Sequence, residues 1–172
     1  MNNDIVLNIL RFLGLMALQV LFVNNINLFG LVTPSVFVLF ILLLPHAIKP
    51  TGLMLIAMFA GFTQDVFQGT LGLNMFCAVF LAFSRPYILS IITDKKMDDE
   101  FKISLQEQGF RWTVLYLILS FFLYHMVYFT VEIWNFQNIL YIIFKSVYSG
   151  IFSVVFSLVL LYTFYKGKER KY

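Results

Sequence analysis

Apolar residues fall into six long runs that are separated by short polar connections. The runs cover residues 5–23, 34–48, 52–67, 71–92, 112–131 and 139–165. A helix needs about 20 apolar residues to cross the hydrocarbon layer of a bilayer, and runs of about this length recur along the chain. The pattern predicts an all-α integral membrane protein with about six transmembrane helices. The runs 34–48 and 52–67 are short, so they could instead form a hairpin that does not fully cross.

Composition supports a lipid environment for most of the surface. Hydrophobic residues make up 60% of the 172 residues and charged residues only 12%, with 21 Phe. Soluble domains carry about 25% charged residues, so a water-exposed surface could not be built from this sequence. Six crossings would use nearly the whole chain, which predicts a single polytopic membrane domain over residues 1–172. The first run begins before Arg11 and no small-x-small cleavage pattern follows it, so we expect a retained helix.

Lysine and arginine are distributed asymmetrically along the predicted topology. The connections 24–33, 68–70 and 132–138 contain neither residue. Positively charged loops are retained on the cytoplasmic side, so both termini are expected to be cytoplasmic, together with a segment at about 93–110 and a basic tail at 166–172. The formal net charge of +3 is then explained by topology and by attraction to anionic lipid, not by a nucleic-acid surface. The residues on the expected cytoplasmic side are Lys49, Lys95, Lys96, Lys102, Arg111, Lys166, Lys168, Arg170 and Lys171.

The expected cytoplasmic segment has an apolar repeat of its own. Met97, Phe101 and Leu105 recur every four residues, which would place one apolar stripe along a short helix at the lipid headgroups. An ordinary solvated helix explains the same pattern. The single cysteine, Cys77, lies inside an apolar run and is expected to be a small buried hydrophobe.

Ionisable residues within the apolar runs are the first candidates for function, because a charge in the hydrocarbon costs several kcal/mol unless it finds partners or water. Asp65 is expected about one helical turn from the outer end of its span, and Arg85 about four turns from it. This separation predicts that the two do not pair. Arg85 is expected to extend its side chain toward the inner face and lipid phosphate.

Three further ionisable residues lie in the last two runs. Glu132 and Lys145 belong to the outer ends of adjacent antiparallel spans, so a structural ion pair is expected between them. His125 lies on the same helix face as Glu132 and deeper in the membrane. It is interpreted as a hydrogen-bonded packing histidine, with a proton relay as the alternative.

Small residues mark the expected packing faces of two spans, because small side chains allow close contact between helices in lipid. No phosphate-binding glycine loop, nucleophile elbow or metal-spaced His and Cys cluster is present in the sequence, so neither a cofactor, a metal nor enzymatic activity is expected. The small residues are Ala57, Gly61, Ser146, Ser149, Gly150, Ser153 and Ser157.

A distinctive polar and glycine-rich motif lies at residues 61–74, where Gly61 is followed by Asp65 and then by Gly69 and Gly72. Pro34 opens the second run, Leu44-Pro45-His46 closes it, and Glu132 closes the fifth. In this order the features resemble the bacterial rod-shape-determining protein MreD family. The long aromatic-rich segment 93–112 departs from the family pattern, so partner contacts are not carried over to it.

The resemblance implies a non-enzymatic inner-membrane component of the cell-wall elongation machinery. Its expected partners are a bitopic MreC-like protein, the actin-like MreB filament, the RodA glycosyltransferase, a class B penicillin-binding transpeptidase and membrane lipid. The family is also similar in fold to the membrane substrate-binding subunits of energy-coupling-factor transporters. A vitamin- or small-solute-binding transporter subunit is therefore the alternative function, because fold alone does not fix function.

Two further hypotheses stay open. The turn from Asp65 to Gly72 could shape a cavity mouth or partner socket, with the carboxylate capping exposed amides, or it could be a plain helix-ending turn. A membrane enzyme that acts on lipid-linked wall precursors is a third functional hypothesis, because Asp65, His125 and Glu132 are capable of acid-base chemistry and lie near one leaflet.

Overall fold

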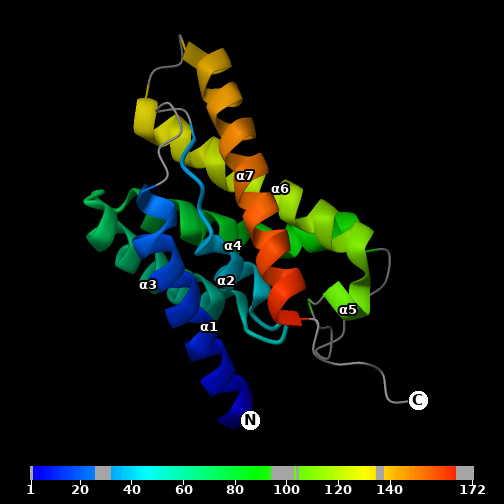
Figure 1. Cartoon of the computed structure of the whole chain (residues 1–172). Helices are drawn as coiled ribbons and strands as arrows, with labels where there is room; N and C mark the ends of the chain where they lie inside the picture. Colours follow the sequence, from blue (N-terminus) through cyan, green and yellow to red (C-terminus); the bar gives the residue numbers. More distant parts are fainter. Residues whose placement is uncertain (1, 26–31, 94–102, 104, 135–137, 166–172) are drawn as a thin grey trace.

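The computed structural model describes residues 2–25, 32–93, 103, 105–134 and 138–165, and this part of the chain is all-helical. Figure 1 shows how its helices are arranged. In chain order the elements are α1 (Asn2–Leu21), η1 (Val23–Asn25), α2 (Val38–Leu43), α3 (Pro50–Gln68), α4 (Leu73–Ile92), α5 (Leu105–Gln108), α6 (Phe110–Ile133) and α7 (Ile139–Tyr165).

Four of these helices are long and apolar enough to cross a membrane, over Ile5–Asn25, Leu73–Ile92, Phe110–Ile133 and Ile139–Thr163. The prediction of an all-α protein with transmembrane helices is confirmed to this extent. Helix α3 is not among these four. Its 19 residues give it a length of about 28 Å, but its C-terminal part carries Gln64, Asp65 and Gln68. These polar residues lower its mean hydropathy.

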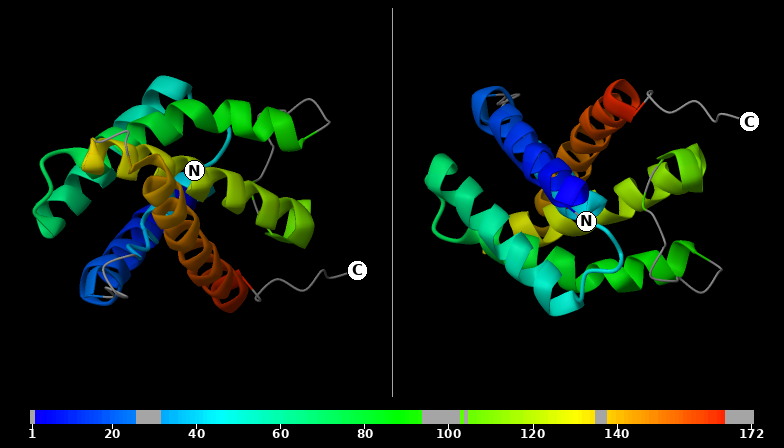
Figure 2. Two further views of the ribbon diagram at one scale, coloured as in Figure 1. Left: turned by 90° about the horizontal axis from the view of Figure 1, so that it is seen from above. Right: turned by 90° about the horizontal axis from the view of Figure 1, so that it is seen from below.

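The long helices form two groups, a layer made of α3, α4 and α6 and a pair, α1 and α7, on one side of it (Figure 2). Helices α3 and α4 form an antiparallel hairpin, and α4 and α6 run side by side. Helix α7 packs on α6, and Figure 2 shows α1 and α7 diverging on the same side of the layer that α3, α4 and α6 make. Of the described α1 side chains, only Met16 and Gln19 are buried, so most of this helix faces outward.

The predicted second span, 34–48, is wrong as a single membrane-crossing helix. Its only helix is α2, six residues long and so about 9 Å in length. Residues 32–37 precede it without forming an α-helix, and every residue from 34 to 42 is buried. We call residues 32–44 the buried passage. Figure 1 shows it descending through the middle of the helices toward the start of α3.

The ends of the helices fall into two groups (Figure 1). The start of α1, the connection from α2 to α3, helix α5 and the end of α7 lie in the lower and right-hand part of Figure 1. The end of η1, the turn between α3 and α4, and the start of α7 lie in its upper left. Of the described residues, Lys49 lies in the connection from α2 to α3 and Arg111 lies next to α5, whereas Lys145 lies near the start of α7. We refer to the first group as the inner side and to the second as the outer side. The predicted apolar stripe at Met97 and Phe101, and the basic tail, lie outside the described residues.

Candidate functional site

The buried passage lies where lipid and water cannot hydrogen-bond its backbone, so other groups must do so. The side-chain amide of Gln19 in α1 both accepts hydrogen bonds from this backbone and donates one to it. Its Oε1 accepts from the backbone N–H groups of Val36 at 2.6 Å and Phe37 at 3.2 Å. Its Nε2 donates to the Pro34 carbonyl at 3.1 Å. One buried carboxamide thus replaces the backbone bonds that a continuous helix would have made itself.

Helix α7 contributes a row of serines to the same segment. The backbone N–H of Thr33 donates to Ser149 Oγ at 3.1 Å, and that of Ser35 donates to Ser153 Oγ at 2.9 Å. Ser153 Oγ in turn donates to the Ser149 carbonyl at 2.8 Å. The small-residue stripe predicted on this helix is therefore an internal packing face. Its members Ser146, Ser149, Ser153 and Ser157 are all fully buried.

His125 of α6 joins this row from the opposite side. Its Nε2 lies 3.0 Å from Ser153 Oγ, and its ring stacks against Phe121 and Phe129. The side chain is fully buried. This arrangement confirms a hydrogen-bonded packing histidine. Ser153 Oγ also accepts from the Ser35 N–H and donates to the Ser149 carbonyl, so one hydroxyl links His125 to the buried passage and to α7.

Arg85 holds the inner end of the buried passage. Its Nη2 donates to the carbonyls of Leu42, at 3.2 Å, and Leu44, while its Nε donates to Tyr116 Oη at 3.0 Å. Tyr116 Oη then donates to the same Leu42 carbonyl at 3.2 Å. Arg85 is only 2% exposed, so the predicted extension toward lipid phosphate is wrong. Unpaired carbonyls of the interrupted helix offer the guanidinium a nearer set of acceptors.

Replacing Arg85 by Met should lower the free energy of unfolding by about 2 kcal/mol. The carbonyls of Leu42 and Leu44 lose a charged donor, whereas the cost of burying the guanidinium is removed at the same time. Thermal unfolding in detergent would measure the change. The control is Arg111→Met at the exposed inner end of α6, where a change below about 0.5 kcal/mol is expected. Equal effects of the two substitutions would contradict the proposed bonding role.

Asp65 lies at the outer end of α3, where it caps the next helix. Its carboxylate accepts from the backbone N–H groups of Asn74 and Met75, both at 2.9 Å. It also accepts from Asn74 Nδ2 at 3.0 Å and from Thr70 Oγ1. The N-cap position of α4 is Gly72, which has no side chain to perform this task. The expectation that the carboxylate caps exposed amides is confirmed.

The two glycines of this turn adopt left-handed backbone conformations. Gly69 ends α3 with φ of 70°, and Gly72 begins α4 with φ of 81°. Residues with a Cβ are strained at such angles, so the turn depends on glycine at both positions. The sharp reversal brings Asp65 against the first turn of α4. Asp65 and Arg85, as predicted, have separate partners and make no ion pair.

A chain of side-chain bonds extends from this cap to three other elements. Asn74 Oδ1 accepts from Tyr124 Oη of α6 at 2.8 Å, and Asn74 Nδ2 donates to Gln68 at 2.9 Å. Gln64 donates to Gln68 at 3.3 Å and to Asn24 at 2.9 Å. Asn24 also accepts from Gln19, at 2.8 Å. The Asp65 cap and the Gln19 bonds to the buried passage therefore belong to one network.

Glu132 and Lys145 form the predicted ion pair at the outer ends of α6 and α7. The distance from Lys145 Nζ to Glu132 Oε2 is 3.2 Å, and the two side chains are 12% and 36% exposed. Lys145 Nζ also lies 4.6 Å from the centre of the Phe129 ring. The pair joins the two helices where their connection begins.

A double-mutant cycle with Glu132→Gln and Lys145→Gln should give a coupling energy of about 1 kcal/mol. Partial exposure limits the attraction, and salt screens it. The cycle can be measured by thermal unfolding in detergent, and the coupling should shrink when the ionic strength is raised. A coupling that is independent of salt would contradict an electrostatic origin.

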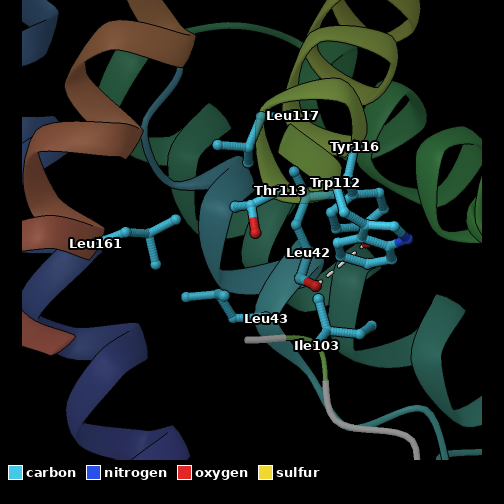
Figure 3. A pocket seen from close by; sticks show the side chains of 8 residues that line it. All are labelled: Leu42, Leu43, Ile103, Trp112, Thr113, Tyr116, Leu117 and Leu161. Carbon is cyan, nitrogen blue, oxygen red and sulfur yellow. Dashed lines mark hydrogen bonds between the residues drawn. The ribbon is translucent and has the colours of Figure 1, made fainter. Parts of the chain in front are cut away.

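The inner side of the buried passage is closed by a small apolar cluster. Figure 3 shows Leu42, Ile103, Trp112 and Tyr116 gathered there, with the bond from Tyr116 to Leu42 drawn as a dashed line. The remaining cavity has a volume of about 10 Å³, which is room for about one water molecule. Ile103 is 8% exposed, so this residue of the predicted cytoplasmic segment packs back onto the helices.

The sequence predictions identified several residues of this network but not its centre. Asp65, Gly69, Gly72 and Pro34 lie within it, and Glu132 and Lys145 form their own pair. Gln19 and Tyr116 were missed. A carboxamide in an otherwise apolar span costs free energy unless it has a partner, and this was the signal that could have identified Gln19.

These features define a membrane protein whose long helices enclose a buried segment of the same chain that is helical only over Val38–Leu43. Comparisons with protein-family models, with curated proteins and with solved structures find no match to the chain.

Proposed function

We propose that this chain is a non-enzymatic, multi-pass component of the bacterial cell-wall elongation complex, located in the inner membrane with both termini in the cytoplasm. Its role would be to hold an MreC-type bitopic protein and other elongation partners, such as MreB, RodA and a class B transpeptidase, next to one another. The proposal starts from the resemblance of residues 61–74 to the MreD family. Proteins of this kind act by binding, so their polar interior should serve structure.

The observation that carries the proposal is that the polar residues of the interior make structural hydrogen bonds and ion pairs within the chain. The three residues capable of acid-base chemistry near the outer side are all engaged in structural bonds: Asp65 caps α4, Glu132 pairs with Lys145, and His125 bonds Ser153. The space between the helices is filled by the buried passage, in which Val36, Val38 and Ile41 have no exposed surface. Both features favour a packed binding protein over an enzyme or a solute-binding subunit.

We further propose that the chain makes six passages through the membrane, with the topology of the energy-coupling-factor membrane subunits. Helices α1, α3, α4, α6 and α7 would make five of them. The buried passage would make the other, because it leads from the outer end of α1 toward the start of α3. Non-helical backbone is tolerated at membrane depth only where protein encloses it, and residues 34–42 are all buried.

Depletion and co-purification in the native host test the function. Loss of the protein should convert rod-shaped cells to spheres, and the tagged protein should retain a bitopic partner after mild solubilisation. A depleted strain that keeps its shape and elongation rate would refute the proposal. Thermal-shift screening of the purified protein against vitamins would test the transporter alternative, since a saturable shift would favour that alternative.

A further inference from the structure

Ile103 packs against the cavity at the inner end of the buried passage. It lies outside the described helices, between α4 and α5, yet it is only 8% exposed. Figure 3 shows its side chain beside those of Leu42, Trp112 and Tyr116. The space that remains is about 10 Å³, or room for about one water molecule. Because Ile103 belongs to no helix, it can leave this position without unfolding one. The cavity is also lined by Leu43, Thr113, Leu117 and Leu161.

Two residues that line this cavity also hold the Arg85 guanidinium. The ring of Tyr116 faces the cavity, while its Oη accepts from Arg85 Nε at 3.0 Å and donates to the Leu42 carbonyl at 3.2 Å. The side chain of Leu42 lines the cavity as well, and its carbonyl accepts from Arg85 Nη2 at 3.2 Å. The cavity that Ile103 closes therefore lies directly next to the bonds that fix the inner end of the buried passage.

These bonds depend on the exclusion of water. A hydrogen bond from a charged donor is strengthened in a low-dielectric interior, and water that reached the Leu42 carbonyl or the Tyr116 hydroxyl would compete for both. The lining of the cavity is almost wholly apolar. Its Thr113 hydroxyl is engaged elsewhere, since it donates to the Gly109 carbonyl at 3.0 Å. With Ile103 in place, the cavity therefore has little that would retain water.

We propose that Ile103 is an intramolecular latch for the buried passage, an inference that does not depend on the proposed function. When Ile103 is docked, the cavity stays dry and Arg85 holds the carbonyls of Leu42 and Leu44. When Ile103 withdraws, the cavity widens by the volume of its side chain and admits water from the inner side to these bonds. The inner end of the passage then loosens, whereas its outer end stays bonded to Gln19.

Cysteine labelling of the purified protein in detergent tests the latch. Leu44→Cys places a thiol at the inner end of the passage, where Leu44 is 3% exposed and lies outside the cavity lining. Ile103→Ala removes most of a buried aliphatic side chain, so it should raise the rate of labelling by N-ethylmaleimide at position 44 on the order of tenfold. The rate at Val36→Cys, at the outer end, should not change. Cys77 is fully buried in α4, and its labelling in the same samples reports global unfolding.

Two further substitutions calibrate the labelling. Phe110→Ala is the matched control, because Phe110 lies at the inner end of α6 but is 63% exposed and does not line the cavity. It should leave the rate at position 44 within about twofold of the parent. Ile103→Val keeps most of the packing and should raise the rate less than Ile103→Ala does. An unchanged rate at position 44 with Ile103→Ala, or an equal rise at position 36 or at Cys77, would refute the latch.

Tyr116→Phe tests whether the latch acts through the Tyr116 hydroxyl. This substitution keeps the ring in the cavity and removes the group that bonds both Arg85 and the Leu42 carbonyl. It should raise labelling at position 44 by itself, and Ile103→Ala should then add much less than its full factor, as expected for residues that support the same bonds. Rates that multiply fully in the double variant would show that Ile103 acts without Tyr116 and would overturn the coupling.

Discussion

Replacing Asp65 by Ala is expected to lower the free energy of unfolding by about 4 kcal/mol, because several buried bonds to one charged group are lost together. The backbone N–H groups of Asn74 and Met75 would be left without an acceptor at the start of α4. Thr70 and the Asn74 side chain would lose theirs as well. Gly72 cannot replace the cap because it has no side chain.

Two substitutions calibrate this prediction. Asp65→Asn keeps one acceptor oxygen and places an amide donor against a backbone N–H, so about half of the loss is expected. Thr70→Val removes a single bond to the carboxylate and should cost about 1 kcal/mol. Chemical or thermal unfolding in detergent would rank the three. If Asp65→Ala were no worse than Thr70→Val, the cap would not be what holds α3 against α4.

The same cap explains why the α3–α4 turn was predictable while the interior was not. Gly69, Gly72 and Asp65 are local signals: two glycines mark left-handed positions, and a carboxylate one turn away can reach the exposed amides. The long apolar runs likewise predicted the four helices that can cross a membrane, although six spans were predicted in all. Each of these features depends on residues that are near one another in the sequence.

The buried passage depends on residues that are far apart in the sequence. Its apolar composition is that of a membrane helix, and hydropathy cannot distinguish a segment enclosed by protein from one enclosed by lipid. Ser35 bonds Ser153, which is 118 positions away. The Leu42 carbonyl accepts from Arg85, 43 positions away, and from Tyr116, 74 positions away. The prediction for Arg85 failed for this reason, since its acceptors are created only when the second run breaks.

Gly61 controls how closely α3 and α4 approach, and it provides the second large expected effect. A Cβ at this position would lie 2.5 Å from Met75 Cα and 2.6 Å from the Asn74 carbonyl oxygen. Both contacts are with backbone, which cannot rotate away, so the helices would have to separate. We expect Gly61→Ala to lower the free energy of unfolding by about 3 kcal/mol, and Gly61→Val to lower it further.

Separation at Gly61 would also lengthen the bonds from Asp65 to Asn74 and Met75, because these are the residues that the new Cβ would displace. The effects of Gly61→Ala and Asp65→Ala should therefore be less than additive in the double variant, as expected for residues that support one contact. Gly14→Ala is the control, since nothing lies within 4 Å of its Cβ position. That substitution should be neutral or stabilising by up to about 1 kcal/mol. Additive losses at Gly61 and Asp65 would show that packing and capping act independently at this turn.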